Sequence, residues 1–236
     1  MGLITQKEIT REVKAVQIDV RGDIISNDDK WIYDWLDWDS TSPGDIKNAL
    51  MTKPQGEKLT VLINSGGGSV MAGQEIYSML HGRDDVEIKV QSLAGSAASV
   101  IAMANHCEIS PVAMIMIHNV SMSGASGDYH DMQKNAEILR QMNAALASAY
   151  VTKTGRSNDE ILRLMDRETW LTANQALEMG FVDGIIKDEK PVFANNVSSM
   201  RLTDEIRNRV LNEKAQKEKE DKLKNELLQD LDLYGV

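Results

Sequence analysis

The chain contains one cysteine, Cys107, so it can form neither an intrachain disulfide nor a multi-cysteine metal site. Its four histidines are scattered and lack the spacing of a zinc site. No apolar run approaches the roughly 20 residues that cross a bilayer, and the start MGLITQKEIT lacks the features of a signal peptide. These absences predict a soluble protein in a reducing cytoplasm, without metal or membrane.

Basic residues are also scarce, because 26 Lys and Arg stand against 36 Asp and Glu, for a net charge of −10. A nucleic-acid or anionic-membrane surface needs clustered cations to replace counterions, so such partners are not expected. The hydrophobic fraction of 42% and the charged fraction of 26% are ordinary for a folded globular chain.

Short apolar runs alternate with helical patterns along the first half of the chain. Strands are predicted at 13–24, 58–65, 86–93 and 113–118, with glycine-rich turns opening helices at 66–80 and 94–105. This alternation predicts an α/β fold with a largely parallel sheet.

The second half is predominantly helical. Residues 128–153 lack Gly and Pro and carry apolar residues at helical spacing, which predicts a helix of about 35–40 Å, longer than a compact monomer requires. Shorter helices are expected at 157–166 and 172–180. Residues 201–236 mix both charges densely and form no sustained heptad, so we expect one folded domain at 1–200 and a helical or disordered charged extension at 201–236.

Ser99 lies in KVQSLAGSAASVIAMAN, where a buried strand ends and a helix begins. Free backbone N–H groups at such a turn can stabilise an oxyanion, which suits a nucleophilic serine. Packing or capping explains a small residue there equally well. His118 ends the apolar strand AMIMIH and is the histidine best placed to act as a base, whereas His81, His106 and His130 lie at helix ends or on the long helix.

Two further segments complete the candidate chemistry. LINSGGGSV is either a tight turn or half of an oxyanion hole, and it fits no phosphate-binding motif. Asp166 and Glu168 precede Trp170 and Leu171, and either carboxylate could orient an imidazole or be an ordinary surface charge.

Taken in order, LINSGGGSVMAG, LAGSAASV, MIHN and ETWLTANQALEMGFVD resemble the proteolytic subunits of the Clp proteases, over about 58–188. The resemblance implies a crotonase-like (ClpP-like) fold with repeated β-β-α units and a long handle helix. It implies a serine endopeptidase without metal or organic cofactor, in which Ser99 is the nucleophile and His118 the base. The backbone N–H groups of Gly68 and Val100 would form the oxyanion hole, and Glu168 would be the acid, with Asp166 as the alternative.

The sequence departs from the family pattern at several points. Gly66 stands where the family has proline, the interval from Ser99 to His118 is several residues shorter, and the first 57 residues do not resemble the region that meets a ring ATPase. With the charged extension, these departures resemble the Clp-related proteases of phages and prophages. That branch implies ATP-independent or partner-assisted cleavage of capsid or scaffold proteins by a ring-shaped homo-oligomer, in the host cytoplasm or the procapsid.

Other functions remain open on the sequence alone. A housekeeping degradative subunit would share the triad and need an AAA+ unfoldase. An acyl-CoA enzyme of the wider crotonase group would stabilise an oxyanion with the same backbone groups. A non-catalytic scaffold component would keep the fold without enzymatic activity. Signal-peptide peptidases share the fold, but the sequence offers no membrane segment.

Overall fold

The computed structural model describes residues 16–187 and 202–234, with side chains up to residue 225. The start of the strand predicted at 13–24, the rest of the N-terminal segment and the expected domain boundary at residue 200 lie outside the described residues. The strands are β1 Val16–Ile24, β2 Ser40–Thr41, β3 Leu59–Gly68, β4 Val86–Gly95, β5 Cys107–Ile109, β6 Met114–Ile117, β7 Thr169–Thr172 and β8 Gly184–Ile185. The helices are the short η1 Asn27–Asp29, then α1 Lys30–Trp35, α2 Pro43–Thr52, α3 Val70–Leu80, α4 Ala97–Ala102, α5 Tyr129–Thr154, α6 Asn158–Asp166, α7 Ala173–Glu178 and α8 Asp204–Tyr234.

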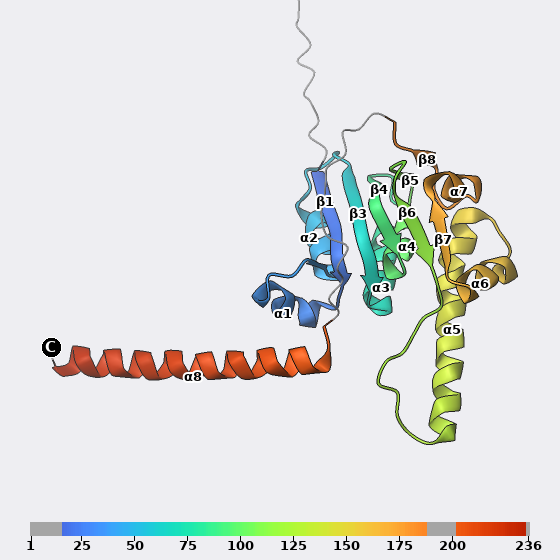
Figure 1. Ribbon diagram of the computed structural model, residues 1–236. Helices are drawn as coiled ribbons and strands as arrows, with labels where there is room; N and C mark the ends of the chain where they lie inside the picture. The colour runs from blue at the N-terminus through green and yellow to red at the C-terminus, as the bar shows by residue number, and fades with distance from the viewer. Residues whose placement is uncertain (1–15, 188–201, 235–236) are drawn as a thin grey trace, which may run out of the picture.

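All the strands belong to one sheet, whose order is β2-β1-β3-β4-β5-β8. The neighbours along this path are parallel, as the alternation of strands and helices predicts. β6 branches off beside the end of β4, and β7 pairs antiparallel with β6. The carboxyl ends of β3, β4 and β6 therefore lie together, and this is the edge at which the candidate residues gather (Figure 1).

The apolar runs of β3 and β4 supply the centre of the core. Val61, Ile63, Ile88 and Val90 are fully buried, because strands of a parallel sheet that are covered on both faces need apolar residues on both. α4 packs against β3 and β4, and α3 packs against α4. The close approach of α3 and α4 depends on Gly73, where an added Cβ would lie 3.0 Å from the Cβ of Ala97.

Helix ends follow the chemistry of the sequence. Ser157 and Thr172 cap α6 and α7 with their side chains, and Thr172 forms a reciprocal capping box with Gln175. Asp128 and Asp131 make the same arrangement at the start of α5. Gly180, expected as a helix stop, has φ +83° just beyond the end of α7, which is the left-handed conformation that terminates helices.

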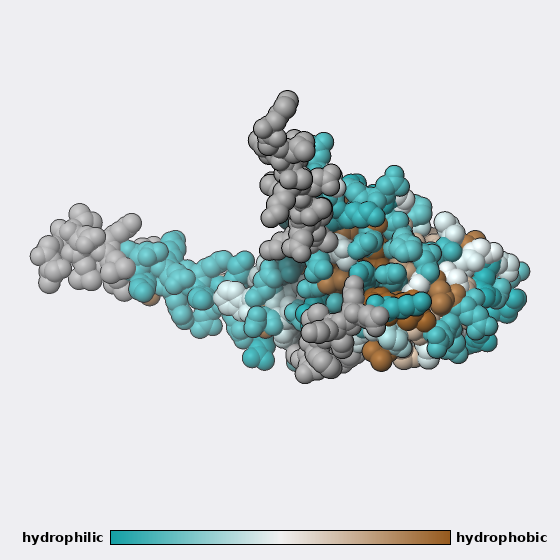
Figure 2. All heavy atoms as spheres, turned by 90° about the horizontal axis from the view of Figure 1, so that it is seen from above, coloured by the Kyte–Doolittle hydropathy of each residue, from teal (hydrophilic) through white to brown (hydrophobic). Residues whose placement is uncertain are grey.

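Two long helices extend beyond the sheet. α5 lies at one side of the sheet, and its first turns project below the body, while α8 leaves the body beside α1 (Figure 1). The described surface of α8 is almost wholly hydrophilic (Figure 2). Its first half is nevertheless attached, since Val210 is buried and Arg207 Nη1 lies 2.5 Å from Asp29 Oδ1.

Candidate active site

Ser96 occupies a sharp turn between β4 and α4. Its backbone has φ 51° and ψ −122°, a positive φ that a residue other than glycine rarely adopts. Its N–H donates to the carbonyl of Met116, which ties the turn to β6. A strained strand-to-helix turn of this kind exposes a serine hydroxyl above a sheet, and small residues on both sides, here Ala94 and Ala98, leave it room.

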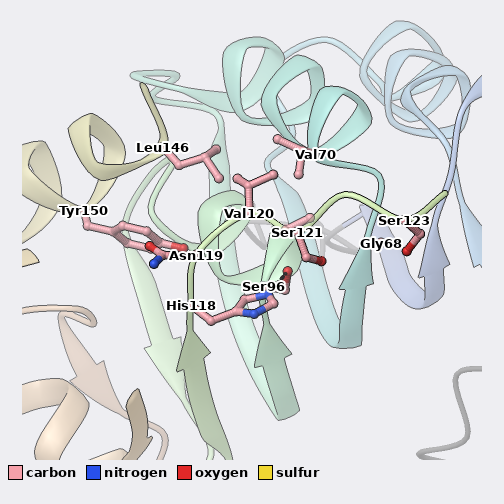
Figure 3. Close-up of a pocket in the computed structure, with 11 residues that line it drawn as sticks. Gly68, Val70, Ser96, His118, Asn119, Val120, Ser121, Ser123, Leu146 and Tyr150 are labelled. Atoms are coloured by element: carbon pink, nitrogen blue, oxygen red, sulfur yellow. Dashed lines mark hydrogen bonds between the residues drawn. The ribbon is translucent and has the colours of Figure 1, made fainter. Parts of the chain in front are cut away.

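His118 follows β6 and faces this turn. Its Nε2 lies 2.7 Å from Ser96 Oγ, and the two side chains point toward each other in Figure 3. With the imidazole proton on Nδ1, Nε2 accepts a hydrogen bond from the hydroxyl. This is the geometry of a nucleophile and its general base.

The side chain of Ser99, the nucleophile expected from the sequence, bonds to other groups than His118 in the described structure. Ser99 is fully buried within α4, and its Oγ lies 2.6 Å from the Ser96 carbonyl oxygen and 2.7 Å from Tyr150 Oη. Because α4 begins at Ala97, Ser99 points back over the first turn into the core and not out over the sheet edge. The prediction that the two glycine-bearing turns converge on His118 holds with Ser96 in place of Ser99.

The glycine turn at the end of β3 packs directly on the Ser96 turn. Gly67 has φ +107°, and a Cβ there would lie 2.7 Å from the Cβ of Ser96 and 3.0 Å from the backbone nitrogen of Ala97. Gly68 has φ +147° and would collide with the backbone of Ile24. Only glycine allows the two turns to come this close.

Two backbone N–H groups are available at this junction. The Ile24 carbonyl accepts from the Ser69 N–H, and Ile24 is in register with Gly68, so the Gly68 N–H points away from β1 toward the end of β4. The Ala97 N–H opens α4, where the first amides have no partner within the helix. The Val100 N–H, predicted as an oxyanion donor, lies instead 3.4 Å from the Ser96 carbonyl oxygen, to which it donates.

Neither candidate carboxylate lies within hydrogen-bonding distance of His118 in the described part of the chain. Glu168 Oε1 accepts from the indole Nε1 of Trp170 at 3.1 Å, and Asp166 Oδ1 accepts from Nδ2 of Asn119 at 2.8 Å. The last pair of the β6–β7 ladder is Ile117 with Thr169. His118 directly follows Ile117, and Glu168 directly precedes Thr169 in a turn with φ 49°, so the two residues flank the same end of the ladder.

A pocket opens beside Ser96 and His118. Val70, Val120 and Leu146 form an apolar part of its wall, while Asn119, Ser121 and Ser123 add polar groups (Figure 3). Tyr150 also reaches this pocket, and burial raises the pKa of its hydroxyl, which keeps it neutral. The pocket therefore combines apolar and polar groups beside the paired hydroxyl and imidazole.

A family model described as Clp protease matches residues 47–189. The chain belongs to the Clp protease family. It is 34% identical over 141 residues to the ATP-dependent Clp protease proteolytic subunit 1 of Chlamydia muridarum, covering 58% of this chain and 73% of that relative. It is 33% identical over 134 residues to the proteolytic subunit 2 of Tropheryma whipplei, covering 55% and 73%.

The fold of this Clp-family chain is also that of a solved relative. The structure of a ClpP1 point mutant from Listeria monocytogenes matches with a TM-score of 0.58 and 22% identity, over 73% of this chain and 91% of the other. The Clp-protease α/β fold expected from the motifs is therefore present.

Sequence reasoning missed Ser96 and Ala97, although two signals pointed to them. Ser96 is the serine flanked by two small residues on each side, in Ala-Gly-Ser-Ala-Ala. Counting from Ser96 also lengthens the interval to His118 by three residues, which brings it nearer to the longer interval of the family.

Among the described residues, no group of three or more His, Cys, Asp or Glu side chains could hold a metal ion, and no helix there combines the length and apolar character that crossing a membrane requires.

Proposed function

We propose that this chain is a serine endopeptidase with Ser96 as the nucleophile and His118 as the general base. The observation that carries the proposal is the 2.7 Å separation of Ser96 Oγ and His118 Nε2 at a strained turn. Membership of the Clp protease family supports peptide hydrolysis as the reaction.

The reaction proceeds by acyl transfer. Ser96 Oγ attacks the carbonyl carbon of the scissile peptide while His118 Nε2 takes the hydroxyl proton, which it then delivers to the leaving amine. The N–H groups of Gly68 and Ala97 bind the oxyanion of the tetrahedral intermediate. Water, deprotonated by His118, releases the acyl group and restores Ser96.

Glu168 is the proposed acid of the triad. Its place next to Thr169, which pairs with Ile117 beside His118, favours it over Asp166, whose carboxylate is held by Asn119. A change of side-chain rotamer that releases the Trp170 indole would turn Glu168 toward His118 Nδ1. There the carboxylate would fix the tautomer in which Nε2 accepts the serine proton.

The two serines provide a matched test with a fluorophosphonate probe. Ser96→Ala is expected to abolish covalent labelling, while Ser99→Ala is expected to slow labelling without preventing it, and mass spectrometry of the labelled peptide should place the adduct on Ser96. Equal labelling of Ser96→Ala and wild type would refute the nucleophile assignment. An adduct on Ser99 would restore the role expected from the sequence.

The acid assignment has its own matched pair. Glu168→Gln is expected to lower the labelling rate by about 10²- to 10⁴-fold, the range in which a triad acid contributes. Asp166→Asn should leave the rate within about threefold of wild type. The reverse order would identify Asp166 as the acid.

We further propose that the peptidase works as a ring-shaped homo-oligomer in a phage or prophage setting, cleaving capsid or scaffold proteins in the host cytoplasm or procapsid. Gly66 in place of proline and the charged extension from residue 201 support this branch. Coexpression with the capsid and scaffold genes of the same genome should yield cleaved products with wild type and none with Ser96→Ala.

A degradative subunit that depends on an AAA+ unfoldase is the second candidate. The similarity to ATP-dependent Clp protease proteolytic subunits favours it. Adding an unfoldase of the host with ATP should then stimulate degradation of an unfolded protein such as casein. Capsid cleavage without ATP would favour the first candidate, and a chain that no probe labels would support a scaffold component.

A further inference from the structure

The structure leaves two buried hydroxyl groups behind the proposed nucleophile without a role in the reaction. Ser99 is fully buried in α4, and Tyr150 is 1% exposed on α5. Their oxygen atoms are 2.7 Å apart, and Ser99 Oγ also lies 2.6 Å from the Ser96 carbonyl oxygen. Buried hydroxyls are normally hydrogen-bonded. These two form a chain of hydrogen bonds from Tyr150 through Ser99 to the Ser96 carbonyl, which belongs to the turn that carries the proposed nucleophile.

The direction of this line follows from counting hydrogens. A serine hydroxyl has one proton, and a carbonyl oxygen can only accept, so Ser99 must donate to the Ser96 carbonyl. Tyr150 must then donate to Ser99 Oγ. Because burial raises the pKa of Tyr150, its hydroxyl keeps the proton that this relay requires.

The Ser96 carbonyl is held by three donors. Besides Ser99 Oγ, it accepts from the backbone N–H groups of Ser99 at 3.0 Å and Val100 at 3.4 Å. A positive φ at a residue other than glycine is strained and persists only where its surroundings hold it. These donors supply part of that restraint at Ser96.

The peptide bond between Ser96 and Ala97 transmits this restraint from the Ser96 carbonyl to the Ala97 N–H. The Ser96 C=O and the Ala97 N–H belong to one planar trans peptide, so they point in opposite directions. Holding the carbonyl toward Ser99 and the core therefore holds the Ala97 N–H toward the pocket. This N–H is one of the two groups proposed to bind the oxyanion.

We infer that the Tyr150–Ser99 relay is a positioning device that aims the Ala97 N–H at the oxyanion. It joins helix α5 to the catalytic turn and touches no reacting atom. The inference rests on the proposed role of Ser96 and deepens it by assigning a function to the buried Ser99 and Tyr150.

The test uses Tyr150→Phe in the full chain, because this change removes one oxygen atom and keeps the ring packed near Phe181. The probe is an alkyl fluorophosphonate, with which Ser96 Oγ forms an O–P bond, the P–F bond breaks, fluoride leaves and the hydroxyl proton passes to His118. The phosphoryl oxygen accepts the oxyanion donors, so the maximal inactivation rate reports their alignment. The half-saturating probe concentration reports binding.

Tyr150→Phe is expected to lower the maximal inactivation rate about tenfold, less than the 10²- to 10³-fold loss on deleting an oxyanion donor outright. The half-saturating concentration should stay within about twofold of wild type. Ser99→Ala should give at least the same loss, and the double variant should be no slower than Ser99→Ala, because both changes break one relay. Ser148→Ala is the control, since its exposed hydroxyl on the same helix donates to the Ala144 carbonyl and should change nothing.

Different failures have different signatures. A merely structural role would lower the melting temperature of Tyr150→Phe and leave its inactivation rate within about twofold of wild type, which would overturn the inference. Additive losses in the double variant would also overturn it. If Ser96→Ala is labelled as fast as wild type, the proposed function itself fails, whereas an unlabelled Ser96→Ala beside an unaffected Tyr150→Phe removes the relay alone.

Discussion

At the scale of single residues, the site depends on a backbone contact that tolerates no side chain. Gly67 and Ser96 approach so closely that even a methyl group at Gly67 would overlap Ser96 and the carbonyl oxygen of Gly95. The lack of a Cβ at Gly67 therefore helps to position Ser96, the proposed nucleophile.

Gly67→Ala is therefore expected to slow fluorophosphonate labelling at least tenfold and to lower the free energy of unfolding by about 1–3 kcal/mol, the cost of a strained backbone position. Labelling kinetics and urea denaturation measure the two effects. Gly56→Ala is the control, because Gly56 also has a positive φ, +85°, but an added Cβ there meets nothing within 4 Å. Equal labelling rates for the two variants would show that the close approach is unimportant.

The choice between Ser96 and Ser99 shows where the sequence reaches its limit at this scale. Its motifs predicted His118, the glycine turn and the convergence of two strand ends, because each of these follows from local pattern. Which of two serines three positions apart adopts a positive φ depends on where β4 gives way to α4. Element boundaries are the least certain part of a sequence-based prediction, and a shift of three residues here exchanges a partly buried hydroxyl for a fully buried one.

At the scale of elements, one carboxylate joins three segments that are distant in sequence. Asp183 Oδ2 accepts from the Cys107 N–H of β5 at 2.7 Å and forms an ion pair with Lys153 near the end of α5, and the Asp183 N–H donates back to the Cys107 carbonyl. Partial burial alone would raise the pKa of Asp183, but the hydrogen bonds from Lys153 and Cys107 outweigh it, and the pKa is lowered. The folded state therefore favours the charged form.

A lowered pKa in the folded state means that the stabilisation is present above the unfolded value, near 3.9, and is lost as the pH falls through the folded value. Asp183→Asn should reduce the free energy of unfolding by about 1 kcal/mol at pH 7. The difference from wild type should shrink below about pH 4, as measured by urea denaturation across pH 3–7.

Asp84→Asn serves as the control for this change, since Asp84 is exposed in a neighbouring turn. A deficit in Asp183→Asn that stays constant from pH 7 to pH 3 would argue that the amide disturbs packing and that the charge has no part in it.

The sequence predicted the long elements better than the short ones. β1, β3, β4, α3 and α5 carry a clear period over their described lengths, and the structure has them at the expected places. α1, β5, β7 and β8 were missed, because two to six residues are too few to show a period of 2 or 3.6. β7 matters most among these, since it begins directly after Glu168 and pairs with β6, which ends beside His118.

At the scale of the whole molecule, the first half of α5 exposes apolar side chains. Met132 is 39% exposed and Ile138 is 38% exposed, on turns that project beyond the sheet (Figure 1). A second copy of the chain could cover them in the proposed ring assembly.

Met132→Glu/Ile138→Glu is therefore expected to shift the protein toward smaller species in native mass spectrometry at micromolar concentration, because both changes place charge in an apolar contact. Gln141→Glu adds a charge at an exposed position of the same helix and should leave the assembly intact. Wild type that is monomeric under these conditions would contradict the proposed ring.

The C-terminal helix contacts the body through its first half. Lys214 Nζ lies 4.2 Å from the ring centre of Trp31, and Lys217 Nζ lies 5.1 Å from that of Trp35. Deleting residues 202–236 should expose these rings and shift tryptophan emission to longer wavelength, while fluorophosphonate labelling of Ser96 continues. A chain ending at residue 225 keeps both contacts and should match wild-type emission, so loss of labelling in the shorter chain alone would make α8 part of the peptidase domain.

The register of the antiparallel strands β6 and β7 determines how the base and its proposed acid lie relative to each other. His118 directly follows Ile117, and Glu168 directly precedes Thr169, the pair at which the ladder ends. Sliding β7 by a single residue would turn its side chains to the opposite face and shift Glu168 along β6 relative to His118. A chain with this misalignment would lose the contribution of its acid, and its labelling should be slowed as far as Glu168→Gln is expected to slow it.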